Sequence, residues 1–126
     1  MAIVKIGKIV PKLFESIFPI LTDDVIITEK QIIHIKVRHP GDYELYAKYI
    51  PEILEKPDYI IEANKPDTAV LLKEFEENGL RFQLVLRLKA AYDPKSRQNS
   101  IITFMKIRRK EWNRLLNNKN ILYKSV

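Results

Sequence analysis

The stretch that decides the fold is residues 81–89, which read Arg81-Phe82-Gln83-Leu84-Val85-Leu86-Arg87-Leu88-Lys89. Successive side chains of a β-strand point to opposite faces of a sheet, so the phenylalanine and the three leucines share one face. The other face carries polar and cationic side chains at every position except Val85. We therefore predict a strand with a buried leucine face and an open cationic face, on which Arg87 is well placed to meet a ligand.

The residues around this strand predict an antiparallel meander. Glu77-Asn78-Gly79 has the chemistry of a hairpin turn and joins the strand to another over 68–76. Period-two or continuous apolar runs, bounded by polar turns, predict further strands over 58–63 and 99–107. Residues 2–10 are interpreted as a short strand or arm, and residues 121–123 as a short last strand.

Helices are predicted mainly before the meander. Spacings of three and four between apolar residues indicate helices over 11–18 and over 42–56, the latter capped by Asp42 and either kinked or divided at Pro51. A closing helix is expected over 108–117. Helices followed by strands are typical of the α+β class. We therefore expect N-terminal helices packed on a four-stranded antiparallel sheet, with a short C-terminal helix and one sheet face partly open.

Positive charge is concentrated in the last third of the 126-residue chain, although the net charge is only +6. Residues 1–80 hold 10 Lys and Arg against 14 Asp and Glu, whereas residues 81–126 hold 12 against 2. Such asymmetry is typical of a protein that binds a polyanion, and a merely solvated surface is the alternative. The chain lacks cysteine, a phosphate-binding glycine loop and an apolar run of about 18–20 residues that could span a membrane.

Residues 28–40 carry both histidines of the chain and the boundary signals of a helix. Thr28 can cap the helix through Gln31, and Pro40 should end it near His39. His34 and Arg38 are four residues apart and so share one stripe, which places a proton carrier beside a phosphate clamp. A structural role is the alternative: His34 would bond a backbone carbonyl, Arg38 would pair with Glu55 or Asp58, and His39 would cap the helix.

Several strings resemble the phage-type barnase–EndoU–colicin–RelE nuclease domains, in collinear order over residues 25–126. They are Ile32-Ile33-His34-Ile35 with Arg38-His39-Pro40-Gly41-Asp42-Tyr43, Ile53-Leu54 with Pro57-Asp58-Tyr59-Ile60, Leu84-Val85-Leu86-Arg87-Leu88, Asn99-Ser100-Ile101-Ile102-Thr103-Phe104, and Ile121-Leu122-Tyr123-Lys124. Residues 1–24 fall outside the resemblance and are interpreted as an N-terminal arm or linker.

The resemblance implies a small ribonuclease whose cleft lies on the exposed sheet face and whose catalysis needs no metal or cofactor. The catalytic positions that match are His34, Arg38, His39, Arg87, Ser100 or Thr103, and Tyr123. Lys89, Lys95, Arg97 and Lys106 are expected to bind RNA. Periodicity does not decide whether Ser100 or Thr103 faces the cleft.

The function expected from the resemblance is endoribonuclease cleavage by attack of the RNA 2′-hydroxyl on the adjacent phosphate. Such a domain would act in the cytoplasm as a toxin or processing domain of phage or mobile-element origin, alone or delivered within a larger protein. RNA is the expected partner, with tRNA one candidate, and an immunity or antitoxin protein is a candidate second partner. The alternatives are an inactive nucleic-acid-binding module and a protein-interaction module of a phage or conjugative element.

Overall fold

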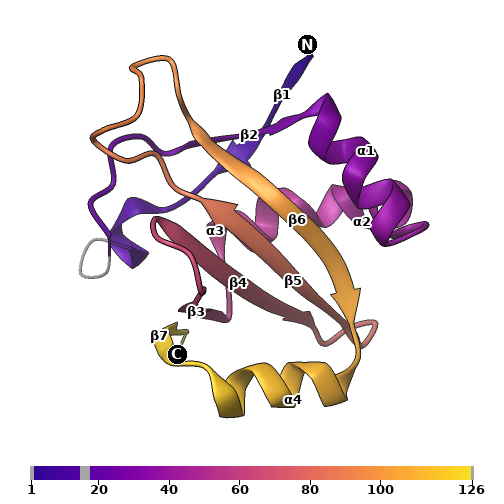
Figure 1. The fold of residues 1–126 in the computed structure, drawn as a ribbon. Coiled ribbons are helices and arrows are strands. Elements are labelled where there is room, and N and C mark those ends of the chain that lie inside the picture. The colour runs from indigo at the N-terminus through magenta and orange to yellow at the C-terminus, as the bar shows by residue number, and fades with distance from the viewer. Residues whose placement is uncertain (1, 15–17, 126) are drawn as a thin grey trace.

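The computed structural model describes residues 2–14 and 18–125 (Figure 1). The helical segments are η1 (Pro11–Leu13), α1 (Glu29–Arg38), α2 (Asp42–Tyr46), η2 (Ala47–Tyr49), α3 (Ile50–Glu55) and α4 (Arg109–Asn118). The strands are β1 (Ile3–Lys8), β2 (Asp24–Thr28), β3 (Tyr59–Glu62), β4 (Thr68–Phe75), β5 (Leu80–Arg87), β6 (Asn99–Ile107) and β7 (Ile121–Lys124).

The described strands form one mixed sheet in the order β1-β2-β6-β5-β4-β3-β7. Every neighbouring pair is antiparallel except β2 and β6, which run parallel with Val25 opposite Asn99 and Ile26 opposite Ser100. The α+β class is correct, but a four-stranded antiparallel sheet behind N-terminal helices is wrong, because the chain starts with a strand and the sheet has seven strands.

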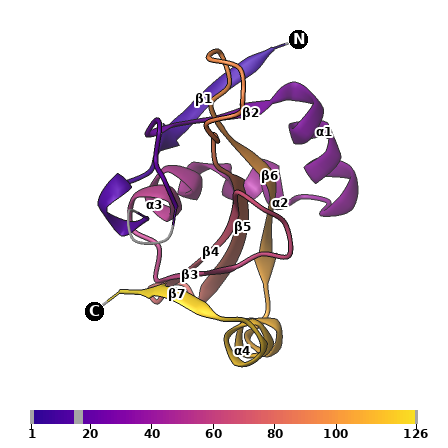
Figure 2. The same ribbon diagram turned by 60° about the vertical axis from the view of Figure 1, so that its left-hand side comes forward.

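The three strands beyond the predicted four are β1, β2 and β7, which are short and pair with segments distant in the sequence. The fully apolar core of β2 is buried, so it shows no alternation from which a sheet face could be predicted. β1, which lies within the segment interpreted as an arm or linker, pairs with β2 at one sheet edge. At the other edge, β7 pairs with β3 (Figure 2).

The main core lies on the sheet face covered by α1, α2 and α3. Phe82, Leu84, Leu86 and Leu88 of the β5 segment are all buried there, which confirms the predicted leucine face. Phe82 stacks on Phe104 of β6 with ring centroids 5.3 Å apart. The alternation of β5 therefore fixes which side of the sheet is core and which side remains for a ligand.

The boundaries of α1 match their sequence signals. The amide of Gln31 donates to the Thr28 hydroxyl at 3.2 Å, and the amide of His39 donates to the Ile35 carbonyl at 2.8 Å just before Pro40. Ile35 is the buried residue of this helix and belongs to the main core. The helix is thus anchored by Ile35, with half-buried Ile32 also packed against the core, and its other side chains are half-buried or exposed.

The helix predicted over 42–56 is divided into α2, η2 and α3. Pro51 stands in the first turn of α3, where its missing amide costs no helical hydrogen bond. Asp42 does not cap α2, because Gly41 with φ of 84° occupies that position and the Asp42 carboxylate accepts from the Lys106 amide at 3.0 Å instead. The helix predicted over 11–18 is a 3₁₀ turn at 11–13, and residues 15–17 lie outside the described part.

α4 covers one end of the opposite sheet face. Trp112 and Leu115 pack in a second apolar cluster with Ile61, Leu72 and other sheet residues. Trp112 meets Tyr59 edge-on, with ring centroids 5.9 Å apart. Among the helices of residues 2–14 and 18–125, none covers the rest of that face. No helix in the described part is long and apolar enough to cross a membrane.

Candidate functional site

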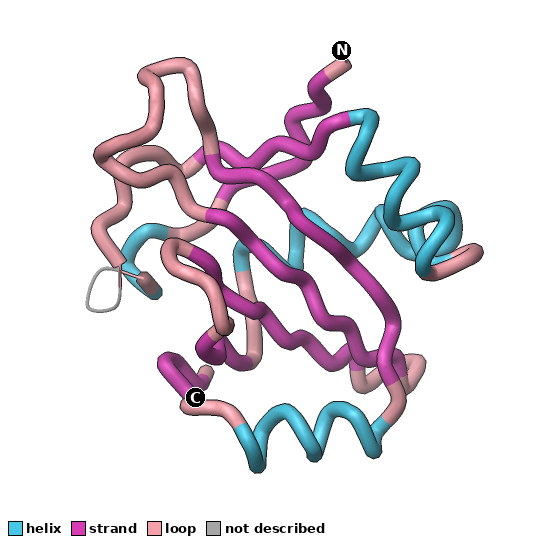
Figure 3. The backbone as a smooth tube through the Cα atoms, viewed as in Figure 1, coloured by secondary structure: helices cyan, strands magenta, loops and turns pink. Residues whose placement is uncertain are grey.

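The sheet face next to α4 is hollowed into a cleft of about 860 Å³. Its floor comes from β4, β5 and β6, and its walls come from the end of β3 and the turn after it, the loop 88–98 and α4. Figure 3 shows the course of these strands, loops and helix along the backbone. The lining residues are Ile61, Glu62, Ala63, Asn64, Lys65, Pro66, Thr68, Val70, Gln83, Val85, Arg87, Tyr92, Arg97, Ile102, Thr103, Arg114, Leu115 and Lys119. The cleft is therefore assembled from segments spread over almost 60 residues of sequence.

The floor confirms the predicted open face of β5. Gln83, Val85 and Arg87 all line the cleft, beside Thr68 and Val70 of β4. Val70 and Val85 form an uncharged middle of the floor, and the polar residues at either end supply hydrogen-bond donors and acceptors. This arrangement can seat a polar ligand across the strands.

A bulge in β6 settles how Ser100 and Thr103 are oriented. Val85 lies opposite Thr103 and Leu86 lies opposite Ile101, so Ile102 is an extra residue on β6. Because the bulge resets the alternation, Thr103 and Ser100 both share the open face with their β5 partners. Thr103 lines the cleft, whereas Ser100 lies opposite Arg87 and is not part of the lining.

Arg87 is held firmly at the end of β5. Its guanidinium pairs with Asp93 through two contacts, of 2.9 and 3.2 Å, and also donates to the Leu88 carbonyl. The side chains of Arg87 and Asp93 are 17% and 7% exposed. Hydrogen bonds from Arg87 and from the Ala90 amide hold the pKa of Asp93 below its usual range. The guanidinium is thus oriented before any ligand arrives.

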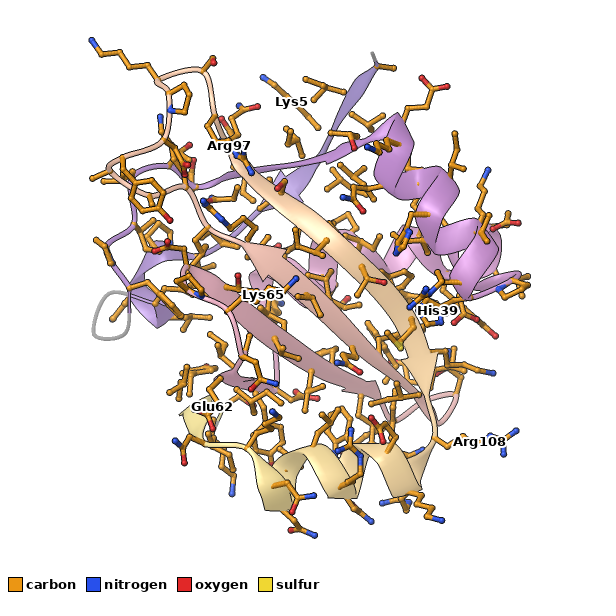
Figure 4. All side chains as sticks on the ribbon, viewed as in Figure 1. Lys5, His39, Glu62, Lys65, Arg97 and Arg108 are labelled. Atoms are coloured by element: carbon orange, nitrogen blue, oxygen red, sulfur yellow. The ribbon has the colours of Figure 1, made fainter. Side chains whose placement is uncertain are left out.

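Four more cations surround the cleft: Lys65, Arg97, Arg114 and Lys119. Arg114 pairs with Glu111 at 2.6 Å, and Lys119 Nζ donates to the Asn64 side-chain oxygen at 3.1 Å. Figure 4 shows Lys65 between Arg97 at one end and Glu62 at the other. Five cations including Arg87 among the lining residues make the cleft attractive to a chain of phosphates.

Glu62 carries the single carboxylate among the described lining residues. Its two oxygens accept from the amide and the side chain of Asn120, at 3.0 and 3.2 Å. These bonds fix the carboxylate at the end of the cleft next to α4. An oriented carboxylate among cations can accept a proton from a bound hydroxyl. Across the described residues, no group of three or more His, Cys, Asp or Glu side chains is arranged to hold a metal ion.

The histidine helix does not contribute to the lining of this cleft. His34 and Arg38 are exposed on α1, which packs through Ile35 into the core on the other face of the sheet. His39 is half-buried beside the far edge of β6 (Figure 4). Of the two partners suggested for Arg38, Asp58 instead accepts from the Glu74 amide at 2.8 Å, and Glu55 forms no ion pair with Arg38 among the described residues. His34 and Arg38 therefore lie on α1 and outside the lining of the cleft.

The other predicted site residues are scattered. Tyr123 lies opposite Ile60 and packs against the main core. Lys89 Nζ donates to the Lys95 carbonyl at 2.9 Å, and Lys106 Nζ lies 5.6 Å from the Tyr46 ring centroid near α2. Of the four predicted RNA-binding cations, Arg97 lines the cleft.

Sequence reasoning missed Glu62, Lys65, Tyr92, Arg114 and Lys119 as site residues. Glu62 ends β3, and the other four lie in a turn, a loop or a helix, so all five reach the cleft only after the sheet has formed. The polar turn Asn64-Lys65-Pro66 was visible as a signal, but nothing in the local sequence relates it to Arg87.

A half-covered sheet with a cationic cleft on its open face defines a small α+β domain suited to a polyanionic ligand. The chain belongs to the phage-Barnase-EndoU-ColicinE5/D-RelE like nuclease2 family, whose sequence model matches residues 4–124. The resemblance seen in the sequence is therefore confirmed, and the match extends through β1. No curated protein and no solved structure matches the chain.

Proposed function

We propose that this nuclease domain cleaves RNA in the cleft, by attack of a ribose 2′-hydroxyl on the adjacent phosphorus and without a metal ion. The observation that carries the proposal is the cleft itself, which has Arg87 and Thr103 on its sheet floor and four further cations and one carboxylate in its described lining. Cations that bind phosphate oxygens stabilise the charge that grows on them in the transition state.

Each step of this reaction has a candidate group in the lining. Arg87 and Lys65 would bind the scissile phosphate, and Thr103 would hold a third oxygen. Glu62 would accept the proton of the 2′-hydroxyl as the new oxygen–phosphorus bond forms. The bond to the 5′-oxygen then breaks, and that oxygen takes a proton from a lining ammonium group. The products are a 2′,3′-cyclic phosphate and a free 5′-hydroxyl.

Incubation with total RNA in excess chelator tests the proposal. We expect cleavage that survives the chelator and leaves 2′,3′-cyclic phosphate ends. Glu62→Gln should lower the rate by about 10²–10⁴, as expected for loss of a positioned acid or base. Glu52→Gln, an exposed position on α3, is the matched control. Cleavage that stops with chelator and returns with a divalent ion would contradict the proposal.

Binding without cleavage is the second candidate function. The observation in its favour is that neither histidine of the chain lines the cleft, although histidine is the usual proton carrier at neutral pH. An inactive module would bind RNA with steep salt dependence and leave it intact. The RNA recovered after the chelator experiment separates the two functions.

His34 and Arg38 on α1 are a rival site for the same reaction. If His34 were the acid or base and Arg38 the phosphate clamp, His34→Ala and Arg38→Ala would each abolish cleavage with little loss of stability. If the cleft carries the reaction, both variants keep cleaving, and Arg87→Ala and Glu62→Gln fail.

A further inference from the structure

Tyr92 is an aromatic side chain presented to solvent at the mouth of the cleft. It is 72% exposed, and it lines the cleft beside Arg87. A single exposed tyrosine is ordinary on a protein surface and needs no explanation. The arrangement of its neighbours, however, restricts the ring in a way that free surface residues do not share.

The ring is fixed by two neighbours. The Tyr92 hydroxyl donates to the Asp67 carboxylate, and the Arg87 guanidinium lies 5.9 Å from the ring centroid. An Arg87 Nη also lies 3.5 Å from the Tyr92 oxygen. Backbone bonds from Asp93 to the Ala90 carbonyl at 3.0 Å and from Arg97 to the Pro94 carbonyl at 2.9 Å hold the loop on either side.

Asp67 reaches Tyr92 from an uncommon backbone conformation. Its φ of 54° lies in the left-handed region, and it is the only non-glycine residue of the described chain with positive φ. Asp tolerates this region better than most residues, yet it still costs conformational energy. The Asp67 carbonyl also accepts from the Leu88 amide at 2.7 Å. Asp67, just before β4, and Arg87, at the end of β5, thus hold the ring from two sides.

We infer that Tyr92 is a stacking platform for one unpaired nucleobase, and that the cleft therefore takes single-stranded or looped RNA rather than a continuous duplex. The inference rests on the proposed function and adds the class of substrate. Aromatic rings bind bases by stacking regardless of base identity, and neighbouring cations bind the backbone on either side. In an A-form duplex the base faces are stacked on each other and not accessible to a side chain.

Tyr92 is assigned to binding and not to the chemical step. The hydrogen bond to Asp67 raises the pKa of Tyr92, so the phenol stays protonated at neutral pH. A neutral phenol pointing at a carboxylate is not available as a base. Because the Arg87 guanidinium lies over one face of the ring, the opposite face is what remains for the ligand.

The test measures binding of fluorescent 2′-O-methyl oligonucleotides, which resist 2′-hydroxyl attack, by anisotropy. Tyr92→Leu keeps apolar bulk without the aromatic face, and Tyr92→Phe keeps the face without the bond to Asp67. We expect Tyr92→Leu to weaken binding of a single strand by about 5- to 150-fold, the range for loss of one stacked base. Tyr92→Phe should retain most of the affinity.

Two further ligands isolate the stacking contact. An oligonucleotide series with one abasic site moved along the strand should contain a position at which Tyr92→Leu no longer differs from the parent. A blunt duplex of the same sequence should bind equally to both proteins. Equal binding of the single strand by parent and Tyr92→Leu would overturn the inference and leave cleavage in the cleft untouched. Equal losses in Tyr92→Leu and Tyr92→Phe, with lower melting temperatures, would assign the residue to loop stability and also overturn it.

Discussion

The salt dependence of RNA binding should report the cations of the cleft directly. The described lining carries five, Lys65, Arg87, Arg97, Arg114 and Lys119. Arg87 and Arg114 are already ion-paired with carboxylates of the chain, whereas no ion pair is found for the other three in the described residues. The unpaired three set the lower limit for the number of phosphate contacts, and Arg87 and Arg114 raise that number where their guanidinium groups bind phosphate beside their carboxylate partners.

The magnitude follows from counterion release. Each phosphate contact on a single strand contributes about −0.7 to the slope of log affinity against log salt. Three contacts give a slope of about −2, and five give about −3.5. Between about 50 and 200 mM salt, these slopes correspond to roughly 20-fold and 130-fold losses of affinity. We expect a value between these limits.

Anisotropy titrations of a non-cleavable single strand at several salt concentrations would measure the slope. Arg97→Ala should make it shallower by about 0.7. Lys56→Ala removes the same charge from the exposed C-terminal end of α3, beneath the covered face of the sheet, and should leave the slope unchanged. Equal slopes for the parent and Arg97→Ala would refute this assignment of the binding surface.

Three further predictions concern stability and positioning. Leu86→Ala empties a fully buried position and should cost about 3–4 kcal/mol in urea unfolding; a loss below about 1 kcal/mol would contradict the assigned core face. The hydrogen bonds from Arg87 lower the pKa of Asp93, so ionised Asp93 stabilises the fold. This stabilisation should be complete above the pKa of an Asp in the unfolded chain, about 3.9, and should be lost as the pH falls through the lower pKa of Asp93 in the folded protein. The stability deficit of Asp93→Asn should therefore vanish in strong acid, and a deficit independent of pH would rule the pairing out. Asp67→Gly suits the positive φ and removes the same hydrogen bond as Tyr92→Phe, so it should keep most of its affinity for a single strand while its melting temperature changes little; a loss of affinity as large as that of Tyr92→Leu would show that this bond, and not the aromatic face, accounts for binding.

Local signals were sufficient for most individual elements. The Thr28 cap and Pro40 predicted both ends of α1, and the alternation of residues 81–89 predicted which face of β5 is buried. The turn at Asn78-Gly79 predicted the β4–β5 hairpin, where Gly79 has a φ of 69°. In each case a few adjacent residues contain the whole physical cause, so no tertiary information is needed.

The sheet order and the cleft depend on contacts between distant segments. The parallel pairing of Val25 with Asn99 joins segments more than 70 residues apart, and no local pattern encodes it. The cleft likewise brings Lys65, Arg87 and Lys119 together from three separate elements. The histidines attracted attention because their chemistry is visible in sequence, yet α1 presents them away from the cleft lining. Arg87 was found because alternation fixes its face.

The most direct test compares two single-site variants in one cleavage assay. Single-turnover cleavage of RNA in excess chelator would be measured for the parent, Arg87→Ala and His34→Ala, with circular dichroism melting to verify that each is folded. If the cleft performs the reaction, Arg87→Ala should be slower by about 10²–10³, as for loss of a charge-stabilising donor, and His34→Ala should match the parent. A folded Arg87→Ala protein that cleaves at the parental rate, with His34→Ala inactive, would contradict the account and place the reaction on α1.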